Sequence, residues 1–192
     1  MKLMYLLVGE SGSGKSTVAQ EMEKWGYKEL KSYTTREPRY EGEDSHIFIT
    51  EDDYVRYKGT NEIVAYTRFN DSHYFCTRTQ LYYNDVYVID PDGIEYLKQH
   101  VDDVRFITIY IDTPLHRRIW RMWKRGDGIK NIIGRIRNDK VKFARIDWDY
   151  KILNINYAET LDLVRLITKT HDYINKYSQE LLNLLEGLSI NG

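Results

Sequence analysis

The chain has 192 residues, a formal net charge of −1 and 42% hydrophobic residues, which allows one domain with a sizeable core. The balanced charge excludes a general attraction to nucleic acid, no apolar run is long enough to span a membrane, and the single cysteine excludes an internal disulfide. Residues 1–4 have no signal-peptide pattern, so we expect a soluble cytoplasmic protein that binds neither nucleic acid nor membrane.

The first predicted elements are a strand over residues 4–8 and a helix over residues 16–25, joined by a glycine-rich loop. The loop fits the pattern G-x-x-x-x-G-K-[ST] in its required strand–loop–helix context. Glycines let successive N–H groups turn toward one anion, and the helix points its positive end at the same place. Lys15 can then reach terminal phosphates, and Ser16 can hold Mg²⁺. We therefore expect a nucleoside triphosphate site at Gly9, Ser11, Gly12, Ser13, Gly14, Lys15, Ser16 and Thr17.

A polar segment follows at residues 31–80, with short alternating pieces near residues 46–49 and 63–66 that predict a small β-rich insertion. Arg36 and Arg39 stand three residues apart in it, with Pro38 stiffening the turn between them. A guanidinium group binds phosphate oxygens in pairs, so two arginines indicate a second anion site. A hydrolase needs only the first site, whereas two sites favour transfer of a phosphoryl group to an acceptor.

The next predicted elements are a strand over residues 86–90, a helix over 93–100 and a strand over 106–111. Asp90 closes the first of these strands, where ligands bind parallel sheets. Two interpretations of Asp90 stay open. Its carboxylate acts on Mg²⁺ through water, or it caps the helix that follows.

Residues 117–145 are rich in arginine and are interrupted by Gly126, Gly128 and Gly134. Beside a phosphate-binding loop, a basic helix pair of this kind predicts a mobile lid, although most basic runs are solvated surfaces. The last predicted strand, residues 150–153, ends before Asn154, and helical spacing then continues from residue 158 to about 188. We interpret this last segment as one long helix or as two helices broken near Thr170.

Alternation of strands and helices predicts an α/β fold of the P-loop NTPase type, with three α/β/α layers around a parallel central sheet. The predicted core comprises residues 1–30, 81–116 and 146–192. The insertion comprises residues 31–80, and the lid comprises residues 117–145.

These motifs together resemble the guanylate kinase family of nucleoside monophosphate kinases. Many families share the glycine loop, but Ser32-Tyr33-Thr34-Thr35-Arg36-Glu37-Pro38-Arg39 at this distance behind it is far more specific. The similarity continues through Gly42-Glu43, Val88-Ile89-Asp90-Pro91-Asp92, Arg125-Gly126 and Tyr150-Lys151-Ile152-Leu153-Asn154. The resemblance implies an ATP-dependent kinase with Mg²⁺ as cofactor, in which the insertion holds a nucleoside monophosphate.

The resemblance also implies roles by position, beyond the glycine loop. Arg36, Arg39 and Tyr74 would hold the acceptor phosphate, Ser32 and Asp92 would face its base, and Asn154 would lie near the adenine. Arg125 and Arg135 would close over the transferring group. The implied catalytic set is Lys15, Arg36, Asp90, Arg125 and Arg135, and the implied acceptor set is Ser32, Arg36, Arg39, His46, Tyr74, Cys76 and Asp92.

Three positions depart from the family pattern. Ala65 stands where a glutamate that reads guanine is usual, His46 replaces a tyrosine, and Cys76 replaces a serine or threonine. A lost bidentate contact changes affinity by roughly 1–3 kcal/mol, so we expect weakened guanine selectivity or a different monophosphate, such as a deoxynucleotide. Glu43, Asp44 or Asp71 would have to replace the lost carboxylate if GMP is preferred.

Three other functions are considered. A GTPase would need N-K-x-D to read its base, and the sequence has no such motif. A non-catalytic guanylate kinase-like binding module typically lacks the working loop and lysine. A kinase for a phosphorylated sugar, of the ribosyl bisphosphate type, shares the T-T-R-x-P-R element and stays open. The sequence leaves open the choice between monomer and homodimer.

Overall fold

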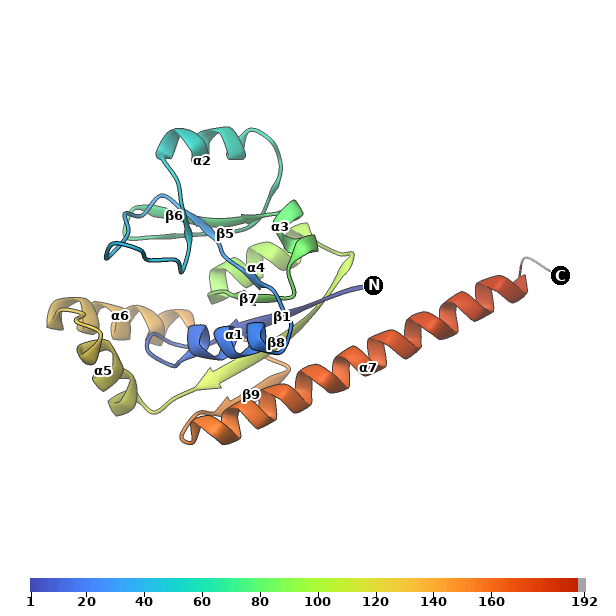
Figure 1. The fold of residues 1–192 in the computed structure, drawn as a ribbon. Coiled ribbons are helices and arrows are strands. Elements are labelled where there is room, and N and C mark those ends of the chain that lie inside the picture. The colour runs from blue at the N-terminus through green and yellow to red at the C-terminus, as the bar shows by residue number, and fades with distance from the viewer. Residues whose placement is uncertain (190–192) are drawn as a thin grey trace.

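The computed structural model describes the backbone of residues 1–189 and the side chains of residues 1–184. Its centre is a sheet of five parallel strands in the order β2-β7-β1-β8-β9 (Figure 1). The strands are β1 (Lys2–Val8), β2 (Glu29–Leu30), β7 (Val86–Val88), β8 (Val104–Asp112) and β9 (Tyr150–Leu153). The expected parallel sheet is therefore confirmed, with β7 shorter and β8 longer than the apolar runs suggested.

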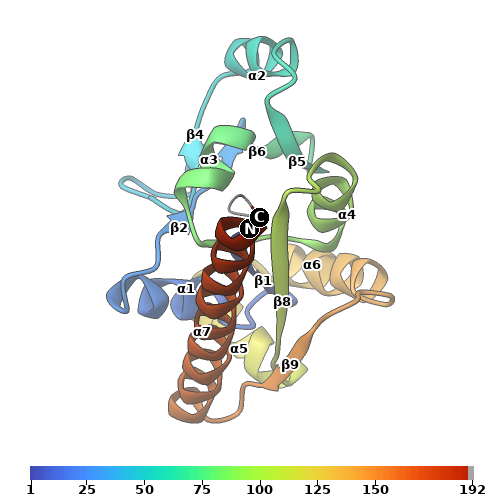
Figure 2. The same cartoon turned by 90° about the vertical axis from the view of Figure 1, so that its right-hand side faces the viewer.

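Helices cover both faces of this sheet. Side chains of β1 alternate between two apolar clusters, Met4 facing one and Tyr5 the other. The cluster around Tyr5 packs against α1 (Lys15–Lys24) and the start of α7 (Tyr157–Ser189), whereas the cluster around Met4 packs against α4 (Pro91–His100) (Figure 2). These layers confirm the α/β/α architecture of a P-loop NTPase, and they bring the carboxyl ends of the strands to one edge.

The insertion after α1 forms a second sheet in the order β4-β3-β6-β5. Its strands are β3 (Tyr33–Thr34), β4 (Ile47–Phe48), β5 (Ile63–Phe69) and β6 (Ser72–Thr77). It also carries two helices that the strand-like patterning did not predict, α2 (Glu51–Lys58) and α3 (Arg78–Tyr83). Each begins with a capping box, from Thr50 to Asp53 and from Thr77 to Gln80. This local signal was present in the sequence, but each helix buries a single residue, so helical periodicity was too weak to reveal it.

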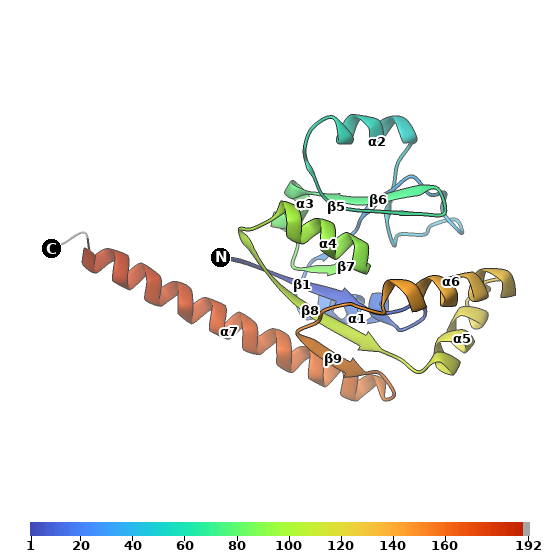
Figure 3. The same cartoon turned by 180° about the vertical axis from the view of Figure 1, so that it is seen from behind.

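The basic segment forms α5 (Leu115–Lys124) and α6 (Ile129–Lys142), joined by a turn at Gly126 (Figure 3). Helix α7 follows β9 and has 33 residues, with no break at Thr170. Its C-terminal part extends beyond the rest of the molecule (Figures 1 and 3). Among residues 1–189, no helix combines the length and apolar character needed to cross a membrane.

Candidate active site

The glycine loop joins β1 to α1 in a conformation that only glycine adopts easily. Gly9 and Gly12 have φ angles of 152° and 77°. A Cβ atom would lie 2.5 Å from the Ile111 carbonyl oxygen at Gly9, and 2.8 Å from the Arg118 carbonyl oxygen at Gly12. Gly14 precedes α1 without a capping side chain, so the first N–H groups of the helix have no side-chain acceptor there. The loop and helix start thus offer donors to an anion.

Lys15 folds back over the loop. Its Nζ atom donates to the carbonyl oxygens of Gly9 at 2.5 Å and Glu10 at 3.2 Å. Burial lowers the pKa of Lys15 to about 8, and the nearby Asp139 carboxylate opposes this shift. An incoming phosphate would supply the negative charge that a buried ammonium group lacks.

Three side chains from distant elements hold the loop by a single carbonyl group. Thr113 Oγ1, Arg121 Nη1 and Asn154 Nδ2 each donate to the Ser13 carbonyl oxygen at 2.9 Å. Asn154 is buried, and its Oδ1 accepts a hydrogen bond from Thr160. Asn154 therefore supports the loop from behind, together with Thr113 and Arg121, which sequence reasoning missed.

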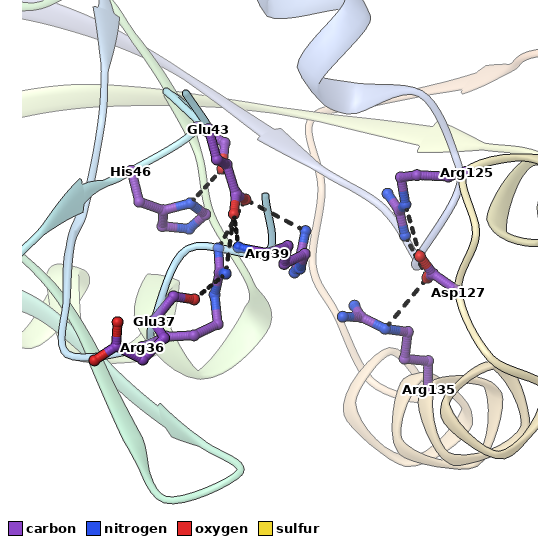
Figure 4. Close-up of polar contacts among 9 residues, drawn as sticks. Arg36, Glu37, Arg39, Glu43, His46, Arg125, Asp127 and Arg135 are labelled. Atoms are coloured by element: carbon purple, nitrogen blue, oxygen red, sulfur yellow. Dashed lines mark hydrogen bonds and ion pairs between the residues drawn. The ribbon is translucent and has the colours of Figure 1, made fainter. Parts of the chain in front are cut away.

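The arginine pair of the insertion is organised by Glu43 (Figure 4). Arg36 donates to both Glu43 carboxylate oxygens, at 2.8 and 3.1 Å, and the Arg39 backbone N–H donates at 2.7 Å. Burial by itself would raise the pKa of Glu43, but bonds from Arg36, the Arg39 backbone and Ser45 outweigh burial and hold it at about 2. Glu43 is thus a charged anchor that fixes Arg36 and the backbone at Arg39.

Arg39 and the lid arginines face one another across a groove. In the lid, Arg125 donates to both Asp127 oxygens, at 3.0 and 2.6 Å, and Arg135 Nε lies 3.7 Å from the same carboxylate (Figure 4). Burial, followed by the charges of Arg36, Arg135 and Arg125, lowers the pKa of Arg39. The two groups of arginines therefore lie near enough to repel one another, which favours an anion between them.

Two connected hollows join the loop, insertion and lid. A cavity of about 250 Å³ is lined by nine of the predicted site residues, Gly9, Ser11, Lys15, Ser32, Arg39, His46, Tyr74, Asp90 and Arg135. A groove of about 640 Å³ adds Ser16 and Arg125 and shares Ser32, Arg39, His46 and Arg135 with the cavity. The remaining predicted residues line neither hollow: Gly12, Ser13, Gly14, Thr17, Arg36, Cys76, Asp92 and Asn154.

Asp90 caps the helix that follows it, which is one of the two interpretations considered. Its Oδ1 accepts the Gly93 N–H at 2.9 Å at the start of α4, while its Oδ2 accepts from Lys142 at 2.7 Å, and the residue lines the cavity. Lys142 also lies 2.6 Å from Asp92. These ion pairs outweigh the effect of burial and raise the pKa of Lys142.

Helix α6 makes a second polar contact, with the glycine loop itself. Asp139 accepts from the Ser11 backbone N–H at 2.8 Å and from its hydroxyl at 3.2 Å, and it is 5% exposed. The Asp139 carboxylate thus lies against the loop, and the Lys142 ammonium group lies against Asp90. Sequence reasoning missed both residues because neither belongs to a motif.

The residues of the insertion that the sequence singled out differ in their surroundings. Ser32 lines the cavity, where its Oγ forms a hydrogen bond of 2.8 Å with Tyr87 Oη. Ala65 and Cys76 pair across β5 and β6 inside the apolar core, where burial raises the pKa of the Cys76 thiol to about 12. Burial, and then Arg36 and Arg39, lower the pKa of His46 to about 4.

No protein-family model matches the chain, and neither does any curated protein sequence. Among solved structures, it is similar to guanylate kinase from Anaplasma phagocytophilum, with a TM-score of 0.59 and 20% identity over 88% of this chain and 86% of that one. It also aligns with TT1252 from Thermus thermophilus, with a TM-score of 0.48 and 16% identity over 88% and 97% of the two chains. At this identity, the likeness to the guanylate kinase is one of fold.

Proposed function

We propose that this protein is an ATP-dependent nucleoside monophosphate kinase, which transfers the γ-phosphoryl group to GMP, dGMP or another (d)NMP with altered base selectivity. One observation carries the proposal. Lys15 from the glycine loop, Arg39 from the insertion and Arg135 from the lid line the same cavity. A donor phosphate on the loop and an acceptor phosphate on Arg39 would therefore meet, with the lid arginine beside them.

The charged groups suit a phosphoryl transfer that needs no covalent intermediate. Positioned cations stabilise charge that spreads over the phosphoryl oxygens in the transition state. Lys15 would bind the terminal phosphates of the donor, while Arg39, steadied through Glu43, would bind the acceptor. Arg125 and Arg135, now held by Asp127, would turn to the transferring group when the lid closes and excludes water.

Magnesium fits this site as a partner of the nucleotide. No group of three or more His, Cys, Asp or Glu side chains within residues 1–189 forms a metal site. Ser16 is exposed in the first turn of α1 and lines the groove, and Asp90 lines the cavity. Both offer hard oxygen donors that suit Mg²⁺ completed by phosphate oxygens and water. When bound there, Mg²⁺ would neutralise charge on the phosphates.

Altered base selectivity is supported by the burial of Ala65 and Cys76. Alanine accepts no hydrogen bond, and the Cys76 side chain is 0% exposed. Base contacts would fall instead to groups on the cavity wall, chiefly Ser32, Tyr87 and Thr67. Hydroxyl groups donate and accept, so this wall discriminates between bases less strongly than a glutamate does.

The test is a turnover assay of the purified protein with Mg-ATP and each NMP and dNMP, with ADP formation as the readout. We expect turnover that needs a nucleotide acceptor, with a preference for guanine lower than a bidentate carboxylate would give. Lys15→Ala and Arg135→Ala should each lower kcat by roughly a hundredfold or more. Arg137→Ala is the matched control, because Arg137 is an exposed arginine on the same helix as Arg135.

Other outcomes would assign the protein differently. Turnover with a ribosyl bisphosphate, and with no nucleotide, would indicate a kinase for a phosphorylated sugar. ATP binding without turnover on any acceptor would indicate a non-catalytic binding module. If Lys15→Ala transferred the phosphoryl group to a nucleotide at the same rate as the wild type, the role proposed for Lys15 in the glycine loop would be contradicted.

A further inference from the structure

Helix α7 has two apolar faces, and only one of them packs on the molecule. Thr160, Val164, Thr168 and His171 are buried against the sheet, with Tyr5 Oη donating to the Thr168 carbonyl oxygen at 2.8 Å. At about 100° per residue, a second set of side chains is centred roughly a third of a turn away from this face. We name this set the free stripe: Leu163, Leu166, Tyr173, Ile174, Tyr177, Leu181 and Leu184.

The free stripe is exposed along its whole length. Its seven side chains are between 43% and 66% exposed, and the rings of Tyr173 and Tyr177 lie 4.2 Å apart along it. Figures 1 and 3 show the C-terminal part of α7 extending beyond the rest of the molecule. A second copy that covered the whole free stripe would bury on the order of 700 Å² of surface on each chain, which is within the range of stable dimers.

The spacing of the stripe identifies its partner as another long helix. Five members of the stripe, at positions 163, 166, 173, 177 and 184, fall together with Thr170 and Glu180 on a series that alternates steps of three and four, the repeat of a coiled-coil seam. The other two members, Ile174 and Leu181, flank this seam. The other helices described between residues 1 and 189 have at most 14 residues, whereas α7 has 33. A second copy of α7 supplies a helix of the required length and the same repeat.

We propose that two copies of this chain associate through their α7 helices in an antiparallel coiled coil, with the two-fold axis passing near residue 175. In this register Leu166 faces Leu184, Tyr173 faces Tyr177, and Thr170 faces Glu180 of the other copy. Each of these three layers then joins apolar with apolar or polar with polar. A parallel pair would instead place Glu180 against Glu180 in the seam, where like charges repel.

The experiment measures the mass of the full-length protein by size-exclusion chromatography with light scattering over a range of micromolar concentrations. We expect twice the 23.0 kDa of one chain at the higher concentrations. Tyr177→Asp should raise the dimer Kd by roughly thirtyfold or more, because each dimer contains the buried charge twice. Asn183→Asp is the matched control, since Asn183 is exposed on the same helix but lies outside the stripe.

A charge exchange tests the register. Thr170→Glu should weaken the dimer, because the new glutamate then faces Glu180 of the other copy. Adding Glu180→Lys to this variant should restore the dimer, because the new lysine then faces the new glutamate. In a parallel pair the double variant would instead weaken the dimer, because each new lysine would face a lysine and each new glutamate a glutamate. Circular dichroism checks that each variant keeps its fold. A wild-type protein that stays at 23.0 kDa throughout, or a dimer that Tyr177→Asp does not weaken, would overturn the proposal.

Discussion

At the scale of single residues, the candidate site consists of charged groups held by partners inside the chain. Several of the ionic groups in and around the two hollows already have an opposite charge or a backbone donor beside them, in the pairs Arg36–Glu43, Arg125–Asp127, Lys142–Asp90 and Asp139–Ser11 N–H. Such pairs satisfy groups that burial would otherwise penalise. Under the proposed function, nucleotide phosphates compete with the carboxylates of these pairs for the same cations and N–H donors. The carboxylates therefore set how tightly the nucleotide binds.

Asp139 gives the sharpest test of this competition. Asp139→Asn keeps the size of the side chain and removes the negative charge beside the glycine loop, so ATP should bind about five- to tenfold more tightly, a change of about 1–1.4 kcal/mol. Isothermal titration calorimetry measures the Kd. Asp147→Asn provides the control, because Asp147 is exposed and equally removes one charge. Unchanged or weaker ATP binding by Asp139→Asn alone would contradict this role.

His46 predicts a dependence of stability on pH. Its pKa falls from 6.5 to about 4 in the folded protein, so between these values the unfolded chain binds a proton that the folded chain does not. The free energy of unfolding should therefore decrease as pH falls from 6.5 toward 4, by up to about 2 kcal/mol from this residue. Urea unfolding at several pH values measures the slope, and His46→Gln should reduce it. An equal slope in both proteins would exclude His46 as its source.

At the scale of elements, the loop between β1 and α1 depends on close packing against its neighbours. Gly12 sits against the backbone at Arg118 in α5, while Thr113 after β8, Arg121 in α5 and Asn154 after β9 hold the next residue. A side chain at Gly12 would push the loop away from these contacts. The proposed phosphate site therefore depends on β1, α1 and α5 packed together, and not on the loop alone.

Two glycine substitutions separate loop geometry from backbone flexibility. Gly12→Ala should lower the free energy of unfolding by about 1–3 kcal/mol and abolish ATP binding, because Gly12 has φ of 77° and its Cβ would meet a carbonyl oxygen. Gly134→Ala, in the interior of α6 with open space around it, should stabilise the protein by about 0.5–1 kcal/mol. Thermal unfolding with and without ATP measures both. A similar response of the two variants would rule out the steric explanation.

At the scale of the whole molecule, three parts converge on one place. The core supplies Lys15, the insertion supplies Arg39 and the lid supplies Arg135 to the same cavity. Arg39 and Arg135 also line the adjoining groove, so ligands in the two hollows share their cations. Binding of one nucleotide should therefore draw the insertion and the lid toward the other.

Hydrogen exchange tests this coupling. ATP alone and the preferred acceptor alone should each slow exchange at the amides of α6 and of residues 33–48. With both ligands present, the slowing should exceed the sum of these two separate effects. The reason is that closure needs anions on both sides of the arginine groups. The amides of β1, buried in the sheet, serve as the internal reference. Strictly additive protection would indicate that the two hollows act independently.

The sequence by itself determined the layers and the glycine loop. Alternation of apolar strands and helices depends on residues close in the chain, and so do the capping and turn residues around Gly9 and Gly14, so a linear pattern records them. The same reasoning identified the arginine pair and the basic helix pair α5 and α6, because charge density and glycine are also local. It missed α2 and α3. Their capping boxes can be recognised in the sequence, but each helix buries a single residue, so no helical repeat of apolar residues is visible.

Only the tertiary structure decided which side chains meet. Asp139 reaches Ser11 across 128 residues of sequence, and Asn154 reaches Ser13 across 141, through contacts that no spacing encodes. The burial of Cys76, the pairing of Asp90 with Lys142 and the unpacked face of α7 likewise depend on how the layers stack. Local hydrogen bonds and periodicity are set by neighbours along the chain, whereas these contacts exist only after the hydrophobic faces have packed.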